Sequence, residues 1–360
     1  MEEKDTNNKV GSKKKSIFKK YKGLKLFGIV FSVLMILLGL LLFTGEGNKV
    51  ILNIAGNYIY PKFDSKDSNP KDSTIDVIGK DTNKELEKVN ENVINILLLG
   101  VEEFEGASNT DAIIIATINT KDNTMKLTSL MRDLYVTIPG YSNNRINSAF
   151  SKGGIALLYE TISLNFGVQM DGYALVGFDA FEKIVDLVNG VEVTLTQKEA
   201  NYLNRHNYIS NPKNRNVVVG TQMLNGNQAL GYCRIRKVST GTESYDFGRT
   251  QRQRAVLNAL FDKIKSKNVI QLGLLMNDAL NRVNIETDIS NKDFNNLLVQ
   301  AMILDIKTLE NKRIPSDGSF NNIKVKLGKY KQDVLEPKDW DATRNEIRQF
   351  IYGDIAVTNK

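Results

Sequence analysis

The stretch VINILLLG at residues 93–100 decides the fold class, because it is a continuous apolar run bounded by polar residues. Such a run is typical of a strand that is buried on both faces of a sheet. AIIIATIN at 112–119 and MKLTSLM at 125–131 predict neighbouring strands, and the Lys-Asp-Asn sequence at 121–123 predicts the turn between them. We therefore expect a sheet that starts with three consecutive strands.

After these strands, helical and extended patterns alternate along the chain. Helices are expected at 148–165, 181–188, 248–265, 269–281, 291–308 and 341–352, and strands at 173–177, 191–195 and 323–327. A polar loop is expected at 201–217. Alternation of this kind predicts a layered α/β domain.

The positive charge of the chain is concentrated at its beginning. The 360 residues carry 48 Lys and Arg against 41 Asp and Glu, a formal net charge of +7. Residues 1–25 hold nine Lys and three acidic residues, so +6 of that charge precedes residue 26. The remainder is nearly neutral, which argues against a nucleic-acid-binding domain.

An uncharged apolar run of eighteen residues follows the basic segment, at residues 26–43. As a helix it would span about 27 Å, close to the thickness of a bilayer core. A cleaved signal peptide is the alternative, but Thr-Gly-Glu-Gly at 44–47 offers no clear cleavage site. Because Lys-rich flanks stay in the cytoplasm, we expect a single-pass anchor with the rest of the chain outside.

The single cysteine and single histidine limit the possible chemistry. Cys233 lies in ALGYCRIR, where alternation would place Tyr232, Arg234 and Arg236 on one face of an extended segment. A small buried core residue is favoured over a nucleophile for Cys233. His206 lies in a stretch of loop composition. Ser-His-Asp catalysis and multi-histidine zinc sites are therefore nearly excluded.

Two carboxylates lie at the ends of the first two predicted strands. Glu102 follows the first strand and Asp111 opens the second, so a hairpin would bring them to one edge of the sheet. Carboxylate pairs of this kind can bind Mg²⁺, which prefers oxygen ligands. The alternative is a pair of solvated loop acids.

Arginine residues gather at the same predicted edge. Arg132 ends the third strand beside Asp133, and Arg234 and Arg236 would share one face, where they repel each other unless an anion lies between them. Asp246 can cap the following helix, and Arg249, Arg252 and Gln253 share its first predicted exposed face. Such a cluster predicts a phosphate or pyrophosphate site.

The ordered motifs from residue 95 to residue 265 resemble the LytR-CpsA-Psr cell-wall glycopolymer ligases. They are NILLLGVEE, NTDAIIIATIN, SLMRDLYVTIPG, RINSAFSKGG, GVEVTL, LNGNQALGYCRIR and DFGRTQRQRAVLNAL. The resemblance implies an α/β/α sandwich with a central mixed sheet and a hydrophobic pocket for a polyprenyl-pyrophosphate-linked glycan. It also implies transfer of the glycan phosphate to a peptidoglycan sugar hydroxyl, often the C6 hydroxyl of N-acetylmuramic acid, at the membrane of a Gram-positive bacterium.

The resemblance also assigns roles to individual residues. It makes Arg132, Arg234, Arg236 and Gln253 pyrophosphate ligands supported by Arg249 and Asp246, and it places Glu102 and Asp111 at a Mg²⁺ ion. We expect the catalytic set to be Asp111, Arg132, Arg236 and Asp246, with Asp111 or Asp246 removing the proton from the acceptor hydroxyl.

The chain departs from the family pattern at three positions. Glu102 and Asn109 stand where the family usually has Asp and Arg, and Met131 stands for the usual Pro. The first two changes shift a carboxylate and remove a cation. A non-catalytic module that binds polyprenyl phosphate or lipid-linked glycan is therefore the alternative. Transcriptional control through the tail of about 25 residues is not favoured, because such a segment is too short to fold alone.

The expected organisation has five parts: a cytoplasmic tail at 1–25, a membrane helix at 26–43, a spacer at 44–92, the catalytic domain at 93–310 and a packed extension at 311–360. The apolar helices at 156–166 and 178–188 are candidates for the lipid pocket, although amphipathic helices of α/β domains often serve only the core.

Overall fold

The computed structural model describes residues 90–104, 107–267 and 308–353, together with scattered positions between 271 and 289. The predicted tail at 1–25, the predicted membrane helix at 26–43 and the spacer up to residue 89 lie outside these ranges. Within the described ranges, no helix combines the length and the apolar character that crossing a bilayer requires.

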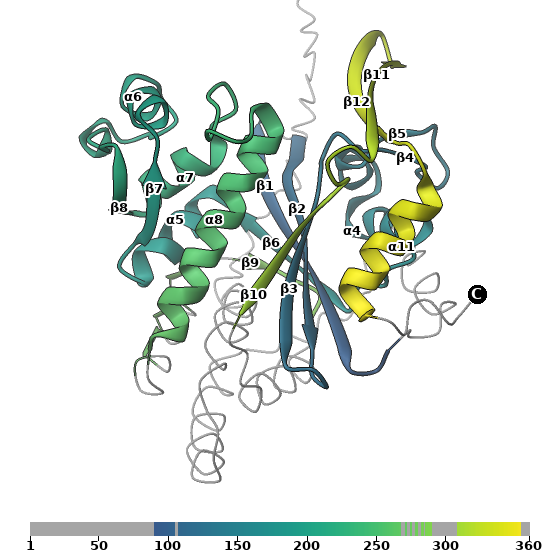
Figure 1. Ribbon diagram of the computed structural model, residues 1–360, viewed down its shortest axis with the longest axis horizontal. Coiled ribbons are helices and arrows are strands. Elements are labelled where there is room, and N and C mark those ends of the chain that lie inside the picture. Colours follow the sequence, from purple (N-terminus) through teal and green to yellow (C-terminus); the bar gives the residue numbers. More distant parts are fainter. Residues whose placement is uncertain are drawn as a thin grey trace, which may run out of the picture.

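A mixed sheet forms the centre of the described structure (Figure 1). Its strand order is β10-β3-β2-β1-β6-β9. The strands are β1 (Val93–Phe104), β2 (Ala107–Asn119), β3 (Thr124–Leu130), β6 (Gly172–Gly177), β9 (Ile285–Glu286) and β10 (Leu309–Ile314). Strands β1, β2 and β3 pair antiparallel in sequence order, while β6 joins β1 and β10 joins β3 in parallel. The three strands predicted at the start of the sheet are confirmed.

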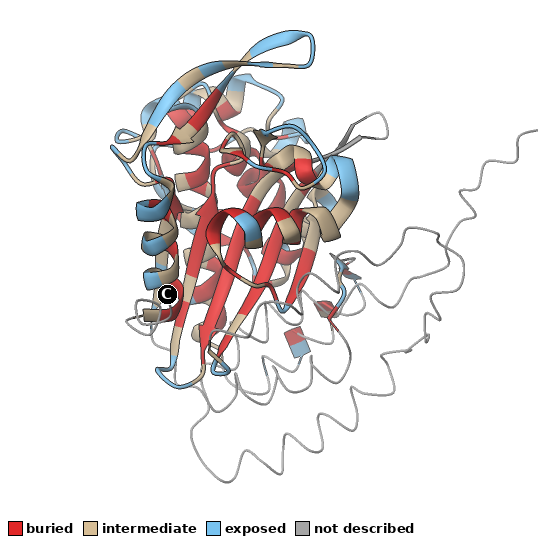
Figure 2. Cartoon of the chain, turned by 90° about the vertical axis from the view of Figure 1, so that its right-hand side faces the viewer, coloured by how far each residue is buried: buried red, intermediate tan, exposed pale blue. Residues whose placement is uncertain are grey.

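Helices cover both faces of this sheet, because the apolar strands are buried on both sides (Figure 2). Successive residues of β1 enter different cores: Leu97 and Leu99 pack with α4 (Asn147–Phe166) and α11 (Trp340–Tyr352). Leu98 packs with α5 (Phe178–Leu187), α7 (Gly226–Arg234) and α8 (Tyr245–Lys265). The expected α/β layering with a central mixed sheet is confirmed.

Three small two-stranded sheets surround the central layers. The strands β7 (Val191–Leu195) and β8 (Gly220–Leu224) flank α6 (Gln197–Arg205) and the short 3-10 helix η3 (Pro212–Asn214). The strands β4 (Tyr135–Val136) and β5 (Asn144–Arg145) pair beside α4. The hairpin of β11 (Phe320–Leu327) and β12 (Tyr330–Pro337) projects from the domain (Figure 1).

Two local predictions were wrong for the same reason. The alternating stretch around Cys233 belongs to helix α7, and the polar loop predicted from residue 201 begins with the last turns of α6. Each helix starts with a capping box, formed by Asn225 with Gln228 and by Thr196 with Glu199. This pattern satisfies the first free backbone donors of a helix, and it outweighs a short alternation of side chains.

The predicted boundary between residues 310 and 311 was also wrong, because it falls inside β10. Strand β10 pairs with β3 over its full length, and α11 contributes Ile347 and Ile351 to the core on the α4 side. The C-terminal segment therefore belongs to the domain. The helix expected at 291–308 lies almost entirely outside the described residues, and the one at 269–281 is described only at scattered positions.

Helices α5 and α7 approach each other closely at a glycine. A Cβ atom on Gly226 would lie 2.0 Å from the backbone oxygen of Glu182 in α5. The amide of Gly226 also donates a hydrogen bond of 2.7 Å to the carboxylate of Asp186. Both helices line the cavity described below, so this contact sets the spacing of its walls.

Replacing Gly226 by Ala should therefore destabilise the protein. Since the clash involves backbone rather than a flexible side chain, we expect Gly226→Ala to lower the free energy of unfolding by about 2 kcal/mol or more. Denaturant titration of both proteins measures this. Gly177→Ala is the matched control, because a Cβ atom there meets nothing within 4 Å. Equal stability of the two variants would contradict the packing argument.

Candidate active site

Asp111 reaches the site because the hairpin of β1 and β2 contains an irregularity at its position. Gly100 pairs with Ala112 and Val101 pairs with Thr110, so Asp111 is an extra residue on β2. A bulge of this kind bends the strand and redirects a side chain. Glu102 pairs with Asn109 within the same hairpin, but the side chains of these two residues lie outside the described part.

Three arginine residues converge on one oxygen of Asp111. The Oδ1 atom lies 2.7 Å from Arg132 Nη1, 3.0 Å from Arg236 Nη2 and 3.0 Å from Arg249 Nη1. These arginines follow β3, follow α7 and lie in the first turns of α8. Segments that are far apart in the sequence thus share a single carboxylate oxygen.

Asp246, near the start of α8, is the second carboxylate of this cluster. Its Oδ2 lies 3.1 Å from Arg132 Nη2. Its Oδ1 lies 3.3 Å from Arg236 Nε and 3.2 Å from Arg249 Nε. Three guanidinium groups therefore face two carboxylates, which leaves an excess positive charge. Such a cluster can accept an anion.

The backbone before Arg132 is held by a bond that proline could not make. The amide of Met131 donates to the Ile314 oxygen of β10 at 2.9 Å. Proline has no amide hydrogen, so methionine at this position allows a hydrogen bond between β10 and the site that proline could not form. Met131 is otherwise buried, and it accepts a hydrogen bond from the hydroxyl of Thr250 in α8.

Asp133 and Arg145 extend the cluster outward from Arg132. The Arg132 Nε atom lies 3.5 Å from Asp133 Oδ2, and Arg145 Nη1 lies 3.2 Å from Asp133 Oδ1. Burial raises the pKa of Asp133, and a hydrogen bond with the Asp246 carboxylate raises it further. Asp133 is thus the carboxyl group of the cluster that holds a proton most readily.

The arginines have the opposite effect on the other two carboxylates. Burial would raise the pKa of Asp111, but Arg249, Arg236 and Arg132 outweigh it and hold the pKa below its ordinary value. The pKa of Asp246 is lowered in the same way, mainly by Arg249 and Arg132 against the effect of burial. Both carboxylates therefore remain charged at neutral pH, together with the arginines around them.

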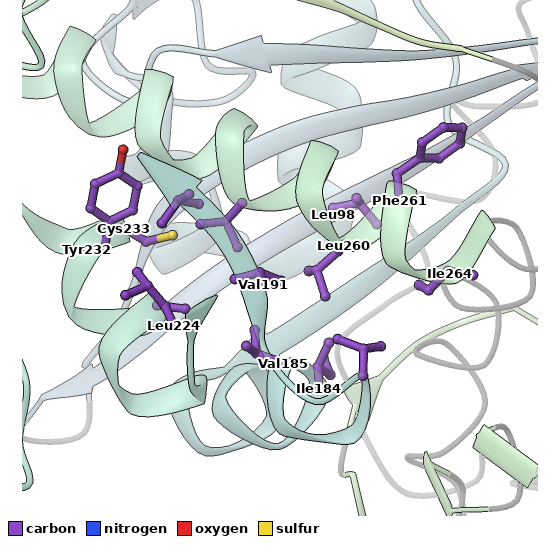
Figure 3. Packing of buried hydrophobic residues seen from close by; sticks show 14 of the residues in the cluster. Leu98, Ile184, Val185, Val191, Leu224, Tyr232, Cys233, Leu260, Phe261 and Ile264 are labelled. Atoms are coloured by element: carbon purple, nitrogen blue, oxygen red, sulfur yellow. The ribbon is translucent and has the colours of Figure 1, made fainter. Parts of the chain in front are cut away.

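A cavity of about 270 Å³ opens beside this cluster, between the sheet and helices α5, α7 and α8. Its body is apolar, with lining residues that include Leu98, Ile114, Ala174, Phe181, Ile184 and Leu260. Figure 3 shows Leu98, Ile184 and Leu260 among the packed side chains of this layer. Of the two helices considered for a lipid pocket, α5 lines the cavity, whereas the buried residues of α4 pack on the other face of the sheet.

The charged residues of the cavity wall are ones that were singled out from the sequence. Asp111, Arg234, Arg236, Arg249 and Gln253 all line it. Arg234, the last residue of α7, places its guanidinium 4.5 Å from the ring centre of Phe178. The cavity therefore joins an apolar body to a cationic wall, and an anion with an apolar chain matches both.

Cys233 also lines this cavity, but as a thiol. It is buried, and burial raises its pKa to about 12. A thiol in this state is not a nucleophile at neutral pH. The interpretation of Cys233 as a buried residue is confirmed, and His206 is exposed at the end of α6, as expected of a surface residue.

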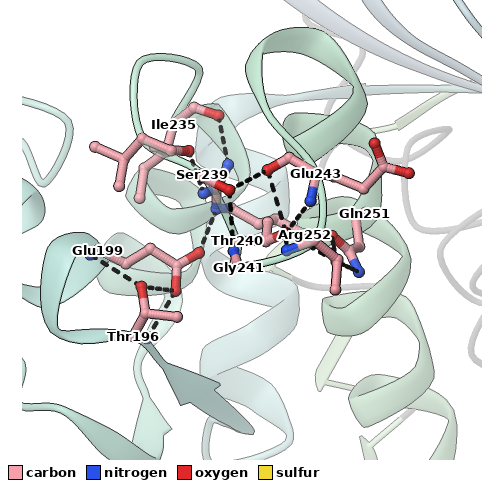
Figure 4. A network of polar contacts seen from close by, with 11 residues as sticks. Thr196, Glu199, Ile235, Ser239, Thr240, Gly241, Glu243, Gln251 and Arg252 are labelled. Atoms are coloured by element: carbon pink, nitrogen blue, oxygen red, sulfur yellow. Dashed lines mark hydrogen bonds and ion pairs between the residues drawn. The ribbon is translucent and has the colours of Figure 1, made fainter.

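Arg252 does not join the site, contrary to the prediction of an exposed face with Arg249 and Gln253. Its side chain is fully buried, and its Nε donates to Glu199 Oε1 of α6 at 2.7 Å. Its two other nitrogens donate to the backbone oxygens of Ile235 and Val238 (Figure 4). Arg252 therefore holds the segment that carries Arg236 against α8.

A Mg²⁺ site would need the substrate to complete it. No group of three or more His, Cys, Asp or Glu side chains gathers for a metal among the described residues. However, Mg²⁺ is commonly held by one or two carboxylates together with substrate phosphates. All three arginine pairs of Asp111 use Oδ1, so Oδ2 takes no part in them. This donor set suits a cation that arrives with a phosphate.

Most of the predicted site residues meet in space. Asp111, Arg132, Arg236, Asp246 and Arg249 form one cluster, and Arg234 and Gln253 line the adjoining cavity. The sequence argument gave no role in the site to Asp133 or to Arg145, which both join the cluster. Arg145 opens the motif RINSAFSKGG, but its contact with Asp133 depends on the packing of β5 and could not be read from that motif.

Removing the charge of Asp111 should cost stability at neutral pH. We expect Asp111→Asn to lower the free energy of unfolding by about 2 kcal/mol, because three guanidinium groups lose a shared counterion. Since the pKa of Asp111 is lower in the folded protein, its contribution is complete above about pH 4 and is lost as the pH falls through the folded value. The difference from the unchanged protein should therefore shrink in acid.

Urea titrations between pH 7 and pH 3 measure this difference. Asp179→Asn is the control, because it removes an exposed carboxylate that pairs with Lys183 at the surface and should change little. The assignment is contradicted if Asp111→Asn and the unchanged protein have the same free energy of unfolding at pH 7. It is also contradicted if the difference between them stays constant down to pH 3.

Comparison with known proteins gives the chain its family context. A model of the LytR_cpsA_psr family matches residues 58–339. The chain is 35% identical over 187 residues to the regulatory protein MsrR of Staphylococcus aureus, which covers 51% of this chain and 53% of that protein. The chain thus spans about half the length of this relative.

Other relatives carry names that describe an activity. The chain is 29% identical over 251 residues to TagV of Bacillus subtilis, a polyisoprenyl-teichoic acid–peptidoglycan teichoic acid transferase, covering 67% of this chain and 61% of that protein. A transferase of the same description, TagU of Enterococcus faecalis, is 27% identical over 256 residues, covering 69% and 74%.

Solved structures agree with the fold. The crystal structure of B. subtilis TagV aligns with a TM-score of 0.55 and 26% identity over 73% of this chain and 98% of that one. TagT with bound octaprenyl pyrophosphate lipid aligns with a TM-score of 0.52 and 25% identity over 74% and 93%. With its fold, its clustered motif residues and a family match over most of its length, the chain belongs to the LytR_cpsA_psr family.

Proposed function

We propose that this protein transfers a glycan phosphate from a polyprenyl-pyrophosphate carrier to a sugar hydroxyl of peptidoglycan. The observation that carries the proposal is the cavity with an apolar body and an arginine-lined wall. A long isoprenoid chain fits the first part and a pyrophosphate fits the second. The teichoic acid transferases among the relatives, and the octaprenyl pyrophosphate bound to TagT, support the same assignment.

In the proposed reaction, the acceptor hydroxyl oxygen forms a bond to the phosphorus that bears the glycan. The bond from that phosphorus to the bridging oxygen breaks, and polyprenyl phosphate leaves. Arg132, Arg236 and Arg249 would stabilise the negative charge that spreads over the phosphate oxygens; their convergence on Asp111 beside the cavity supports this role. Arg234 and Gln253 orient the pyrophosphate from the cavity wall.

The hydroxyl proton passes to a carboxylate, for which Asp111 and Asp246 are the candidates. The two remain alternatives, because Arg132, Arg236 and Arg249 lower the pKa of both, and the hydrogen bond with Asp133 lowers that of Asp246 as well. Asp111, like Asp246, also serves as a counterion that the three arginines share. Together with Glu102 it would hold Mg²⁺, which would neutralise part of the pyrophosphate charge.

The same proposal places the protein at the outer surface of a Gram-positive cell membrane. The apolar run at residues 26–43 would anchor it, with the basic tail at 1–25 inside and the domain outside. An isoprenoid carrier resides in the membrane, so an anchored domain would meet its donor there.

Replacing Arg236 by Ala should remove most of the transfer activity. We expect kcat to fall about 100-fold or more, as for loss of a group that stabilises transition-state charge. The fold should persist, because Arg236 lies at the cavity wall and is partly exposed. The assay measures polyprenyl phosphate release and glycan transfer to a peptidoglycan fragment, with circular dichroism to confirm folding.

Arg205→Ala is the matched control, because Arg205 is exposed at the end of α6. Full activity of Arg236→Ala would refute the phosphate-site assignment. If the unchanged protein binds polyprenyl pyrophosphate but releases no polyprenyl phosphate with Mg²⁺ and acceptor present, the non-catalytic binding module is the better description.

A further inference from the structure

The hairpin of β11 and β12 presents lysine side chains on one face. Its register places Lys326 directly opposite Lys331 and Lys324 opposite Asp333. Directly opposed residues of a two-stranded ribbon share a face, so these four side chains lie together. All four are exposed, and Lys329 lies in the turn beside them.

This arrangement carries an uncompensated charge. Like charges directly opposite each other destabilise a strand pair, and Lys326 and Lys331 are such a pair. The acidic group on this face of the hairpin, Asp333, lies 4.0 Å from Lys324, and both side chains are largely exposed. A bound anion would relieve the repulsion between Lys326 and Lys331.

The base of the hairpin is fastened to the active-site cluster. The amide of Leu335 donates a hydrogen bond of 2.9 Å to the backbone oxygen of Asp133. Arg145 bridges the two parts. Its Nη1 pairs with the Asp133 carboxylate, and its Nη2 donates a hydrogen bond of 2.7 Å to the backbone oxygen of Asp333. Phe320 of β11 stacks on Phe247 of α8 with ring centres 5.5 Å apart.

These contacts place the lysine face within reach of the proposed pyrophosphate. Lys331 is four residues from Leu335, which corresponds to about 13 Å along a strand from the contact with Asp133. Arg132 and Arg145 both pair with Asp133 along this path, and Arg145 continues it to the backbone of Asp333, which lies opposite Lys324. Because the cavity accommodates the lipid, the polymer end of the donor has to leave the arginine cluster on the outside.

We propose that the lysine face, formed by Lys324, Lys326 and Lys331, binds the phosphodiester backbone of a polymer attached to the lipid pyrophosphate. The inference rests on the proposed function and assigns these lysines as the place where the polymer part of the donor binds. Lysine suits this task, because a flexible point charge can follow successive phosphates without requiring one geometry. The hairpin would then select long anionic donors over short neutral ones.

Kinetics with two donors test this proposal on the full-length chain in nanodiscs of neutral phosphatidylcholine. One donor carries a poly(glycerol phosphate) chain on its polyprenyl pyrophosphate, and the other carries an uncharged disaccharide. For the double variant Lys326→Gln/Lys331→Gln we expect KM for the polymer donor to rise about 5- to 10-fold at low salt, with kcat unchanged. KM for the disaccharide donor should stay the same.

Two matched variants isolate position from total charge. Lys121→Gln/Lys198→Gln removes the same charge from exposed residues of the β2–β3 turn and of α6, and should leave both KM values unchanged. Lys326→Arg/Lys331→Arg keeps the charge and should behave as the unchanged protein. The effect of the glutamine pair should also fade as salt is raised, because exposed charges are screened.

Several outcomes would overturn the proposal. If KM of the Lys326→Gln/Lys331→Gln variant changes equally for the two donors, or for neither, the lysine face does not bind the polymer. A rise in KM for both donors that appears only in phosphatidylglycerol nanodiscs would assign the lysines to anionic lipid instead.

If the unchanged protein transfers neither donor, the proposed function fails, and direct binding still decides the role of the hairpin. Soluble poly(glycerol phosphate) should then bind the glutamine pair more weakly than it binds the Lys121→Gln/Lys198→Gln control. Equal binding to both variants would refute the inference.

Discussion

The buried ion pair between Arg252 and Glu199 is the constraint on which the site depends. Both side chains are almost completely buried, so each charge must be compensated within the protein. Arg252 meets this requirement with the Glu199 carboxylate and with two backbone oxygens of the segment that follows α7. Buried pairs of this kind are weak sources of net stability, but removing one partner leaves an uncompensated charge. Their main effect here is to fix positions.

The position that is fixed is that of Arg236 relative to α8. Arg236 lies between the two backbone oxygens that Arg252 holds, while α8 itself carries Asp246 and Arg249. The loop that completes the connection is hydrogen-bonded to α8 through Thr240 and Gln251 (Figure 4). From the opposite side, the irregularity in β2 turns Asp111 toward the same arginines. Three arginines and two aspartates are thereby held together next to an apolar cavity, with the cationic groups in excess.

The strongly periodic and the uniformly apolar segments were predictable. Strands at 93–100 and 112–119 are buried on both faces, and burial of that kind leaves little choice of structure. The stretch around Cys233 misled the prediction, because a short alternation of side chains is weaker than the capping box at Asn225. The C-terminal boundary was misplaced, since pairing of β10 with β3 joins residues almost two hundred positions apart and leaves no local signal.

Part of the site could also be predicted from local sequence, whereas the rest depends on long-range packing. The order of residues is enough to establish an α/β layered domain, the concentration of charge ahead of residue 26, and a set of arginines and aspartates at strand and helix ends. It does not distinguish Arg249 from Arg252, which are three positions apart in one helix. The first faces Asp111 and the second faces Glu199, because a helix turns neighbouring side chains toward different partners and packing alone selects those partners.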